Sequence, residues 1–303
     1  MAIWSLRVIL GAEYVLVLCC GLRDLWRNRR GELQGRDRWA KNALIGFVGD
    51  FLDTLGIGSF APCLFAFKAL HALPQDEQGR DRDDLAPGTL NVGHALPVIV
   101  EALLFLDFVE VEPLTLVGLL LAACLGGLLG ARWVSSWPVN TVRLALAVCL
   151  LLTAAVVLMK QLGIGPYAGA NEALLGLHGW KLGVALAVNF FLGVLMNLGF
   201  GLYAPCMGLL LALGMDVGAI FPIMMGSTAI QMPLSAVVFI REGKYDPKAA
   251  VMIAVFGTLG VLAAFFLVRS MDLTVLLYLV IAVMLYTAAI YLRDGLRARR
   301  QNS

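Results

Sequence analysis

Charged residues are scarce in this sequence. Only 15% of the 303 residues are Asp, Glu, Lys or Arg, whereas 60% are apolar, and the mean hydropathy is +0.84. Soluble domains carry about 25% charged residues, so an ordinary soluble domain is excluded. The formal net charge of +2 is small, and we expect no nucleic-acid partner.

Residues that carry catalysis or bind metals are also few. There are three histidines, His71, His94 and His178, and the sequence contains no H-E-x-x-H, G-x-S-x-G or P-loop motif. The six cysteines lie in apolar stretches without a C-x-x-C pair, which argues against a disulfide framework or a structural zinc site. We therefore predict that the protein is not an enzyme and uses neither a cofactor nor a metal ion.

Long apolar runs dominate the sequence. About seven to nine of them reach the roughly 20 residues that span a bilayer, which predicts an all-α polytopic membrane protein. The first run, 2–22, lacks the basic start and the cleavage site of a signal peptide, so we interpret it as a retained helix.

Basic residues predict the orientation in the membrane. Arginine and lysine are concentrated in segment 23–41, in loop 241–248 and after Tyr291. The positive-inside rule places all three on the cytoplasmic side. We therefore expect a multi-pass protein of the inner (plasma) membrane, with the N-terminus outside and the C-terminus cytoplasmic.

A nine-residue motif occurs twice. Stretch 55–63 returns 143 positions later as 198–206, with six identical residues, and the same offset pairs Phe47 with Phe190. The duplication predicts two internal repeats. The expected parts are an extra N-terminal transmembrane helix with an Arg-rich cytoplasmic loop (1–41), a first repeat (42–160), a linker (161–180), a second repeat (181–292) and a cytoplasmic tail (293–303).

Each copy of the motif predicts a broken helix. A straight helix over 42–73 would be about 50 Å long at 1.5 Å per residue, whereas the bilayer core is about 30 Å thick. Gly56, Gly58 and Pro62 supply a break. A re-entrant hairpin at each break gives inverted repeats, and a full crossing gives parallel repeats. We favour the inverted version because many transporters are built that way.

The two breaks predict an anion site. Unwound backbone at membrane depth must be buried in protein or line a wet cavity, and the short helices starting near Ala61 and Ala204 would point their positive N-termini at that cavity. Close helix packing is the alternative role for the glycines. The predicted substrate contacts in the two motifs are Gly56, Gly58, Ser59, Phe60, Cys63, Gly199, Gly201, Tyr203 and Cys206.

Polar residues on the next helices extend this candidate site. Asn91, His94 and Glu101 share one helical face, and the corresponding helix of the second repeat carries Ser227, Thr228 and Gln231. We expect Asn91 and the latter three to contact substrate. Cys63 and Cys206 either contact a sulfur-containing anion or pack in the interior.

Three ionisable residues are candidates for proton coupling: Asp53, His94 and Glu101. Ionisable groups inside membrane segments are costly and commonly functional. Asp50 and Asp53 share one face before the first break, whereas their partners in the repeat are Gly193 and Met196. This asymmetry favours a cation or proton role confined to one half. Hydration near the cytoplasmic mouth for Asp53, an interfacial position for His94 and a basic partner for Glu101 are the alternatives.

The duplicated motif resembles that of the sulfite exporter TauE/SafE family over about 42–292. That family's motif is richer in glycine, close to G-x-G-G-G followed by proline, whereas the stretches here are Gly56-Ile57-Gly58-Ser59-Phe60 and Gly199-Phe200-Gly201-Leu202-Tyr203. The resemblance implies a permease for sulfite, sulfoacetate or related sulfur-containing or organic anions in a bacterial inner membrane.

These observations predict a secondary transporter of small anions. The alternatives are a non-transporting membrane assembly factor and a passive anion channel, and proton coupling is left open. The expected partners are a small anionic substrate and the lipid bilayer, with homo-oligomer formation also left open.

Overall fold

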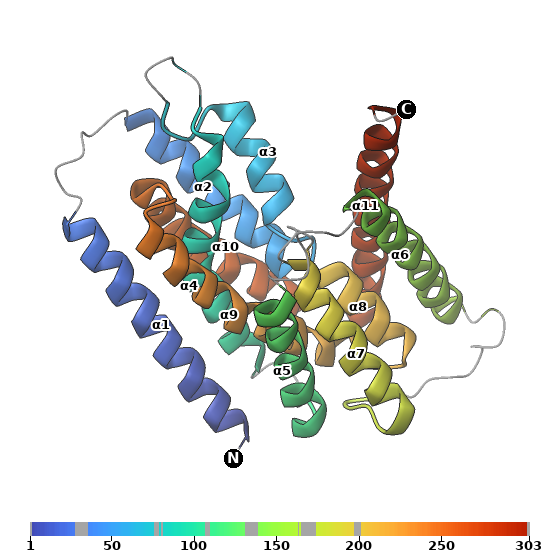
Figure 1. The fold of residues 1–303 in the computed structure, drawn as a ribbon. Helices are drawn as coiled ribbons and strands as arrows, with labels where there is room; N and C mark the ends of the chain where they lie inside the picture. The colour runs from blue at the N-terminus through green and yellow to red at the C-terminus, as the bar shows by residue number, and fades with distance from the viewer. Residues whose placement is uncertain are drawn as a thin grey trace. The chain divides into compact units, whose positions relative to one another are not determined.

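The computed structural model describes residues 2–27, 36–75, 79, 81–106, 110–130, 139–162, 164, 174–196 and 201–301. Within these ranges the chain forms 11 α-helices and one short 3-10 helix, and no sheet (Figure 1). The elements are α1 (Ala2–Arg27), α2 (Arg36–Thr54), α3 (Phe60–Leu70), η1 (Asp83–Leu85), α4 (Ala86–Leu106), α5 (Pro113–Gly130), α6 (Val139–Gln161), α7 (Gly179–Met196), α8 (Tyr203–Ala212), α9 (Val217–Glu242), α10 (Pro247–Ser270) and α11 (Leu273–Gln301).

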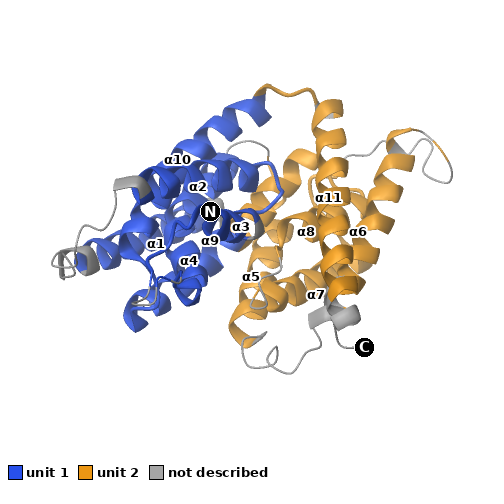
Figure 2. Cartoon of the chain, turned by 90° about the horizontal axis from the view of Figure 1, so that it is seen from above, with its two compact units in different colours: residues 1–107, 228–269 blue, residues 108–227, 270–303 orange. Residues whose placement is uncertain are grey.

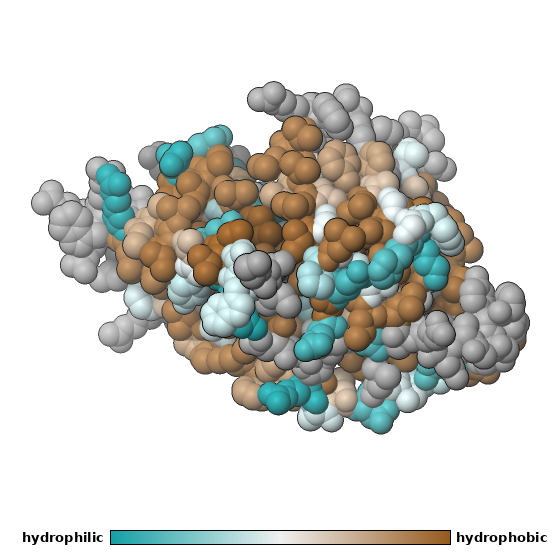
Figure 3. Space-filling model, turned by 90° about the horizontal axis from the view of Figure 1, so that it is seen from below, coloured by the Kyte–Doolittle hydropathy of each residue, from teal (hydrophilic) through white to brown (hydrophobic). Residues whose placement is uncertain are grey.

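The predicted all-α membrane class is confirmed. Six described segments are long and apolar enough to cross a bilayer: Trp4–Arg23, Asp83–Leu106, Gly179–Met196, Val217–Glu242, Pro247–Ser270 and Thr274–Arg297. Large apolar side chains such as Phe65, Trp180 and Phe266 are exposed, and apolar residues cover much of the face drawn in Figure 3. Such a surface fits lipid and would be unusual in water.

The chain divides into two compact units, coloured separately in Figure 2. Unit 1 comprises residues 1–107 and 228–269, and unit 2 comprises residues 108–227 and 270–303. Unit 1 therefore contains α1 to α4, the second part of α9 and α10, whereas unit 2 contains α5 to α8, the start of α9 and α11. Each unit combines helices from both predicted repeats.

In unit 1, α2 and α3 fold back on each other. Asn42 Nδ2, near the start of α2, donates to the carbonyl of Ala72 just beyond the end of α3, at 3.1 Å, and Arg38 Nη1 donates to Leu73 O at 3.3 Å. The two helices are therefore antiparallel.

Helix α10 crosses α2 at very short range within unit 1. Gly260 approaches the carbonyl of Phe47, and Gly46 approaches the backbone of Ile253, so neither glycine has room for a Cβ. Small residues permit this kind of backbone contact between membrane helices. The crossing brings the middle of α10 against the part of α2 that precedes the break.

Unit 2 is built from similar contacts. Gly126 of α5 approaches the carbonyl of Phe190 on α7, and Gly193 of α7 approaches the carbonyl of Ala123 on α5. At the start of α7, Lys181 Nζ donates to Leu213 O, one residue beyond the end of α8, at 3.0 Å. Helices α7 and α8 are therefore also folded back on each other.

Candidate functional site

The chain leaves helical geometry between Thr54 and Phe60. Gly56 has φ 86° and Gly58 has φ 88°, values that residues with a Cβ rarely adopt. A Cβ on Gly58 would meet no atom within 4 Å, so its backbone, and not crowding, is the reason for glycine there. Two glycines with a left-handed backbone conformation, Gly56 and Gly58, thus fix the position of the break in the sequence.

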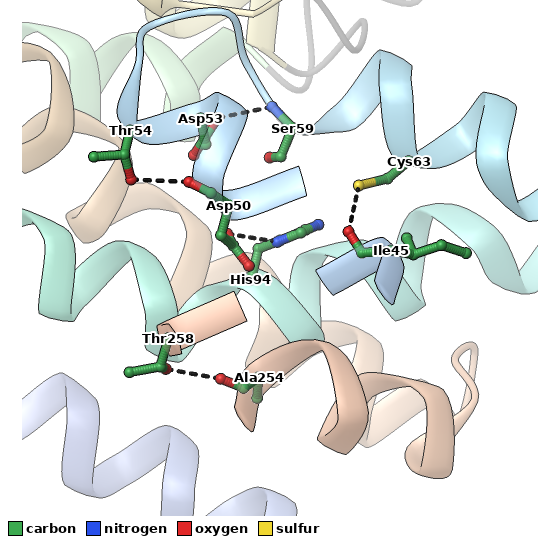
Figure 4. Close-up of polar contacts among 9 residues, drawn as sticks. All are labelled: Ile45, Asp50, Asp53, Thr54, Ser59, Cys63, His94, Ala254 and Thr258. Atoms are coloured by element: carbon green, nitrogen blue, oxygen red, sulfur yellow. Dashed lines mark hydrogen bonds and ion pairs between the residues drawn. The ribbon is translucent and has the colours of Figure 1, made fainter. Parts of the chain in front are cut away.

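The first turn of α3 holds a carboxylate from the end of α2. The backbone N–H of Ser59 donates to Asp53 Oδ1 at 2.7 Å, and both residues are buried (Figure 4). A negative charge at a helix N-terminus is favourable because the helix dipole and the free amides both point to it. The protein's own Asp53 therefore occupies the anion-binding position that the sequence predicted at this helix end.

A second buried contact joins α2 to α4. His94 Nδ1 lies 2.8 Å from Asp50 Oδ1, and both side chains are 0% exposed (Figure 4). The other carboxylate oxygen of Asp50 lies against Gly257 of α10, where a Cβ would collide with it. The Asp50–His94 pair is therefore enclosed by three helices.

Two further predicted residues lie beside His94. Gly49 of α2 has no room for a Cβ, because Cys63 Sγ and His94 Cε1 pack against it. The thiol of Cys63 donates to Ile45 O at 3.7 Å. The Phe60 ring is tilted against the imidazole, with 6.5 Å between centroids. We use the name unit 1 cluster for Asp50, Asp53, Ser59, Cys63 and His94.

Three polar atoms of the unit 1 cluster are buried without a hydrogen-bond partner among the described residues: Asp50 Oδ2, Asp53 Oδ2 and His94 Nε2. A buried polar atom left unsatisfied costs roughly 1–3 kcal/mol. In the described part of the chain, no group of three or more His, Cys, Asp or Glu residues is arranged to hold a metal ion.

The other predicted residues of unit 1 lie on α4 and α9. Asn91 donates to the Pro87 carbonyl of its own helix at 2.8 Å, and Glu101 is buried on α4, two turns beyond His94. Thr228 and Gln231 are buried on the part of α9 that belongs to unit 1. Their roles in substrate binding or proton coupling stay predictions.

In unit 2, α7 ends at Met196 and α8 begins at Tyr203. Gly199, a predicted contact, lies outside the described residues. Gly201 is exposed and would have no atom within 4 Å of a Cβ, whereas Tyr203 and Cys206 are buried on α8. Leu202, the residue that precedes α8, forms no capping hydrogen bond with its own side chain, and the same is true of Ser59 before α3.

Ser227 lies in unit 2, where its hydroxyl donates to Ile223 O at 2.7 Å within α9.

A buried amide that the sequence did not single out lies on α7: Asn189 Nδ2 donates to Leu119 O of α5 at 2.7 Å. The motif repeat relates Asn189 to Gly46, so comparison of the repeats could have found it.

Comparison of the chain with family models, curated proteins and solved structures found no match.

Proposed function

We propose that this protein is a secondary transporter that moves small anions across the membrane. The observation that carries the proposal is the break between α2 and α3. An apolar helical stretch is interrupted at Gly56 and Gly58, and the backbone N–H at the start of α3 donates to the carboxylate of Asp53. Transporters use such half-helix ends to bind ions within the membrane.

Unit 2 supplies the position for the external anion. The residue related to Asp53 by the motif repeat is Met196, which carries no carboxylate. The amides of the first turn of α8 have no tethered carboxylate from position 196. A substrate oxyanion takes the place at α8 that Asp53 takes at α3, because helix N-termini bind anions through free N–H groups and the dipole.

Gly201 lies two residues before the start of α8, and the space beside its Cα is open. The absence of a side chain lets the substrate approach the backbone, as glycines do in phosphate-binding loops. Tyr203 and Cys206, buried on the first turns of α8, border the same helix end. The substrate class we favour is sulfite or a related sulfur-containing or organic anion, on the motif resemblance.

The test is exchange of radiolabelled sulfite, thiosulfate, sulfoacetate or a simple carboxylate across proteoliposomes containing the purified full chain. A transporter gives saturable counterflow of at least one of these anions above empty liposomes. Flux without counterflow identifies a passive channel, and no flux for any anion in the panel refutes transport and favours an assembly role.

A matched pair of variants tests the position in unit 2. Gly201→Leu fills the open approach to α8 and lowers exchange by about tenfold, equivalent to roughly 1.4 kcal/mol of lost substrate interaction. Gly183→Leu is the control, because Gly183 of α7 is also exposed with no atom within 4 Å of a Cβ. Equal exchange by the two variants contradicts the assignment to α8.

A further inference from the structure

We propose that Asp50, His94 and Asp53 of unit 1 form one proton-binding site, and that the proton bound there drives the transport proposed above. The inference depends on that function for its coupling role, whereas the proton site itself stands on geometry. The geometry is the 2.8 Å contact between Asp50 and His94 and the 2.7 Å contact between Ser59 N–H and Asp53.

The charge balance of the three groups points to proton exchange. With His94 protonated and both carboxyls ionised, the site carries a net charge of −1, and one more proton makes it neutral. None of the buried described residues is Lys or Arg, so no fixed cation balances the remaining charge. Because an uncompensated charge is costly away from water, the site has a strong reason to bind that proton.

The protein stabilises the charged form in part. The α3 N-terminus places about half a positive charge beside Asp53, and the amide of Ser59 donates to its carboxylate. The proton-free state is thus supported by a helix end, and the loaded state by neutrality. A site with two accessible states of this kind is what coupled transport needs.

The surroundings of the pair are otherwise poor in titratable groups. Asp53 lies on α2, Cys63 on α3 and Glu101 two turns further along α4, while α10 faces Asp50 with Gly257. Asp50 Oδ2, Asp53 Oδ2 and His94 Nε2 have no hydrogen-bond partner among the described residues. These three atoms are the places where an arriving proton is received or released.

Histidine NMR tests the site without any substrate. The chain contains only three histidines, of which His71 and His178 are exposed and His94 is buried. In full-length protein labelled with nitrogen-15 histidine, the resonance lost in His94→Gln identifies His94. Asp50→Asn is expected to shift both nitrogen resonances of His94 and to change its proton occupancy across the pH range. His178→Gln is the control. An unchanged His94 titration in Asp50→Asn overturns the site.

Transport tests the coupling. In proteoliposomes, the measured quantity is the ratio of anion accumulation driven by a pH gradient to the exchange rate of the same preparation. Asp50→Asn and His94→Gln are each expected to lower this ratio by about tenfold, which corresponds to roughly 1.4 kcal/mol of lost coupling. The His178→Gln control retains the wild-type ratio. Gly257→Ala is a third variant that keeps every titratable group and displaces Asp50 Oδ2, with Pro97 as a further close neighbour of the new methyl group, and it is expected to lower the same ratio. Undiminished gradient-driven accumulation in all three overturns the coupling role.

The two proposals fail differently. If the wild type exchanges no anion but His94 still responds to Asp50→Asn, the transport function is refuted and the proton site stands. If the wild type exchanges anions but its accumulation ignores the pH gradient, transport stands and proton coupling is refuted.

Discussion

Units 1 and 2 share packing contacts but differ in chemistry. At motif-related positions, unit 1 has Asp50 and Asp53 where unit 2 has Gly193 and Met196. Asp50 contacts His94 in unit 1, whereas Gly193 lies against the carbonyl of Ala123 and has no room for a side chain. One position thus serves as a buried acid in one unit and as a close helix crossing in the other.

The shared contacts concern the fold-back and the crossing. Arg38 and Lys181 are 143 positions apart, and each donates to a carbonyl just beyond the short helix of its own unit. Phe47 and Phe190, related by the same offset, each have a glycine against their carbonyl. The two units therefore share these backbone contacts and differ in their acidic residues.

The largest predicted effect concerns the buried pair that unit 2 lacks. His94→Leu leaves Asp50 without its partner and is expected to destabilise the protein by about 3–5 kcal/mol, because an uncompensated buried charge remains. The double variant with Asp50→Leu is expected to lose less, because both polar groups are then removed. Denaturant unfolding in mixed micelles measures both losses, and a double variant at least as destabilised as His94→Leu would falsify the electrostatic explanation.

The second prediction concerns the crossings that the units share. Gly260→Ala in unit 1 and Gly126→Ala in unit 2 each place a methyl group against a backbone carbonyl, and each is expected to destabilise by about 1–3 kcal/mol, the usual range for overpacking. Gly183→Ala, on an exposed part of α7 with open space, is the control and is expected to stabilise its helix by up to about 1 kcal/mol. Thermal unfolding in detergent provides the comparison. A clear loss in only one of the two crossings would show that the units are not packed equivalently.

The third prediction concerns the hydrogen bonds at the two fold-backs. Lys181→Met and Arg38→Met retain the apolar stem but remove the donors to Leu213 O and Leu73 O, and each loss is expected to cost about 1 kcal/mol locally. Hydrogen exchange should increase in residues 213–216 for the first variant and 72–75 for the second. Lys68→Met removes only an exposed ion pair with Asp83 and is expected to change neither segment.

The sequence predicted the helices better than their contacts. In the sequence, the apolar stretches 88–108 and 249–268 correspond closely to α4 and α10, because the length of an apolar run reflects the thickness of the membrane. Periodicity placed His94 on a polar face, and the motif placed Asp53 and Ser59 at the break. Neither signal indicates which helix faces another. The Asp50–His94 contact spans 44 positions, and the role of Gly257 depends on how α10 crosses α2.

The same limit explains Asn91. Its spacing from His94 indicates a shared face, but its amide donates to Pro87 O one turn earlier. A short polar side chain in a helix competes for nearby carbonyls, and sequence spacing does not distinguish that outcome from a contact with substrate. Asn189 is the converse case, because an isolated polar residue in an apolar run gave no pattern, although the helix crossing supplies its partner.

The smallest predicted effect concerns the connection after each short helix. In unit 1 this connection carries Asp81. Burial raises the pKa of Asp81, but hydrogen bonds from His71 and Gln75 outweigh burial and hold the pKa below its ordinary value. In unit 2, only residues 213–216 separate α8 from α9, and Asp216 there accepts backbone hydrogen bonds from the start of α9. Acid is therefore expected to weaken the side-chain contacts of Asp81 in the unit 1 connection.

Because the folded-state pKa of Asp81 is lowered, its stabilising contribution is present above the ordinary carboxyl value of about 4 and disappears as the pH falls through the folded value. The contribution is expected to stay below about 1 kcal/mol, since solvent screens contacts at the surface. Asp81→Asn should remove the difference in hydrogen exchange of residues 71–75 between neutral and acidic pH while leaving residues 213–216 unaffected. A wild-type protein whose two connections respond equally to acid would mean that this difference between the units lies elsewhere than in Asp81.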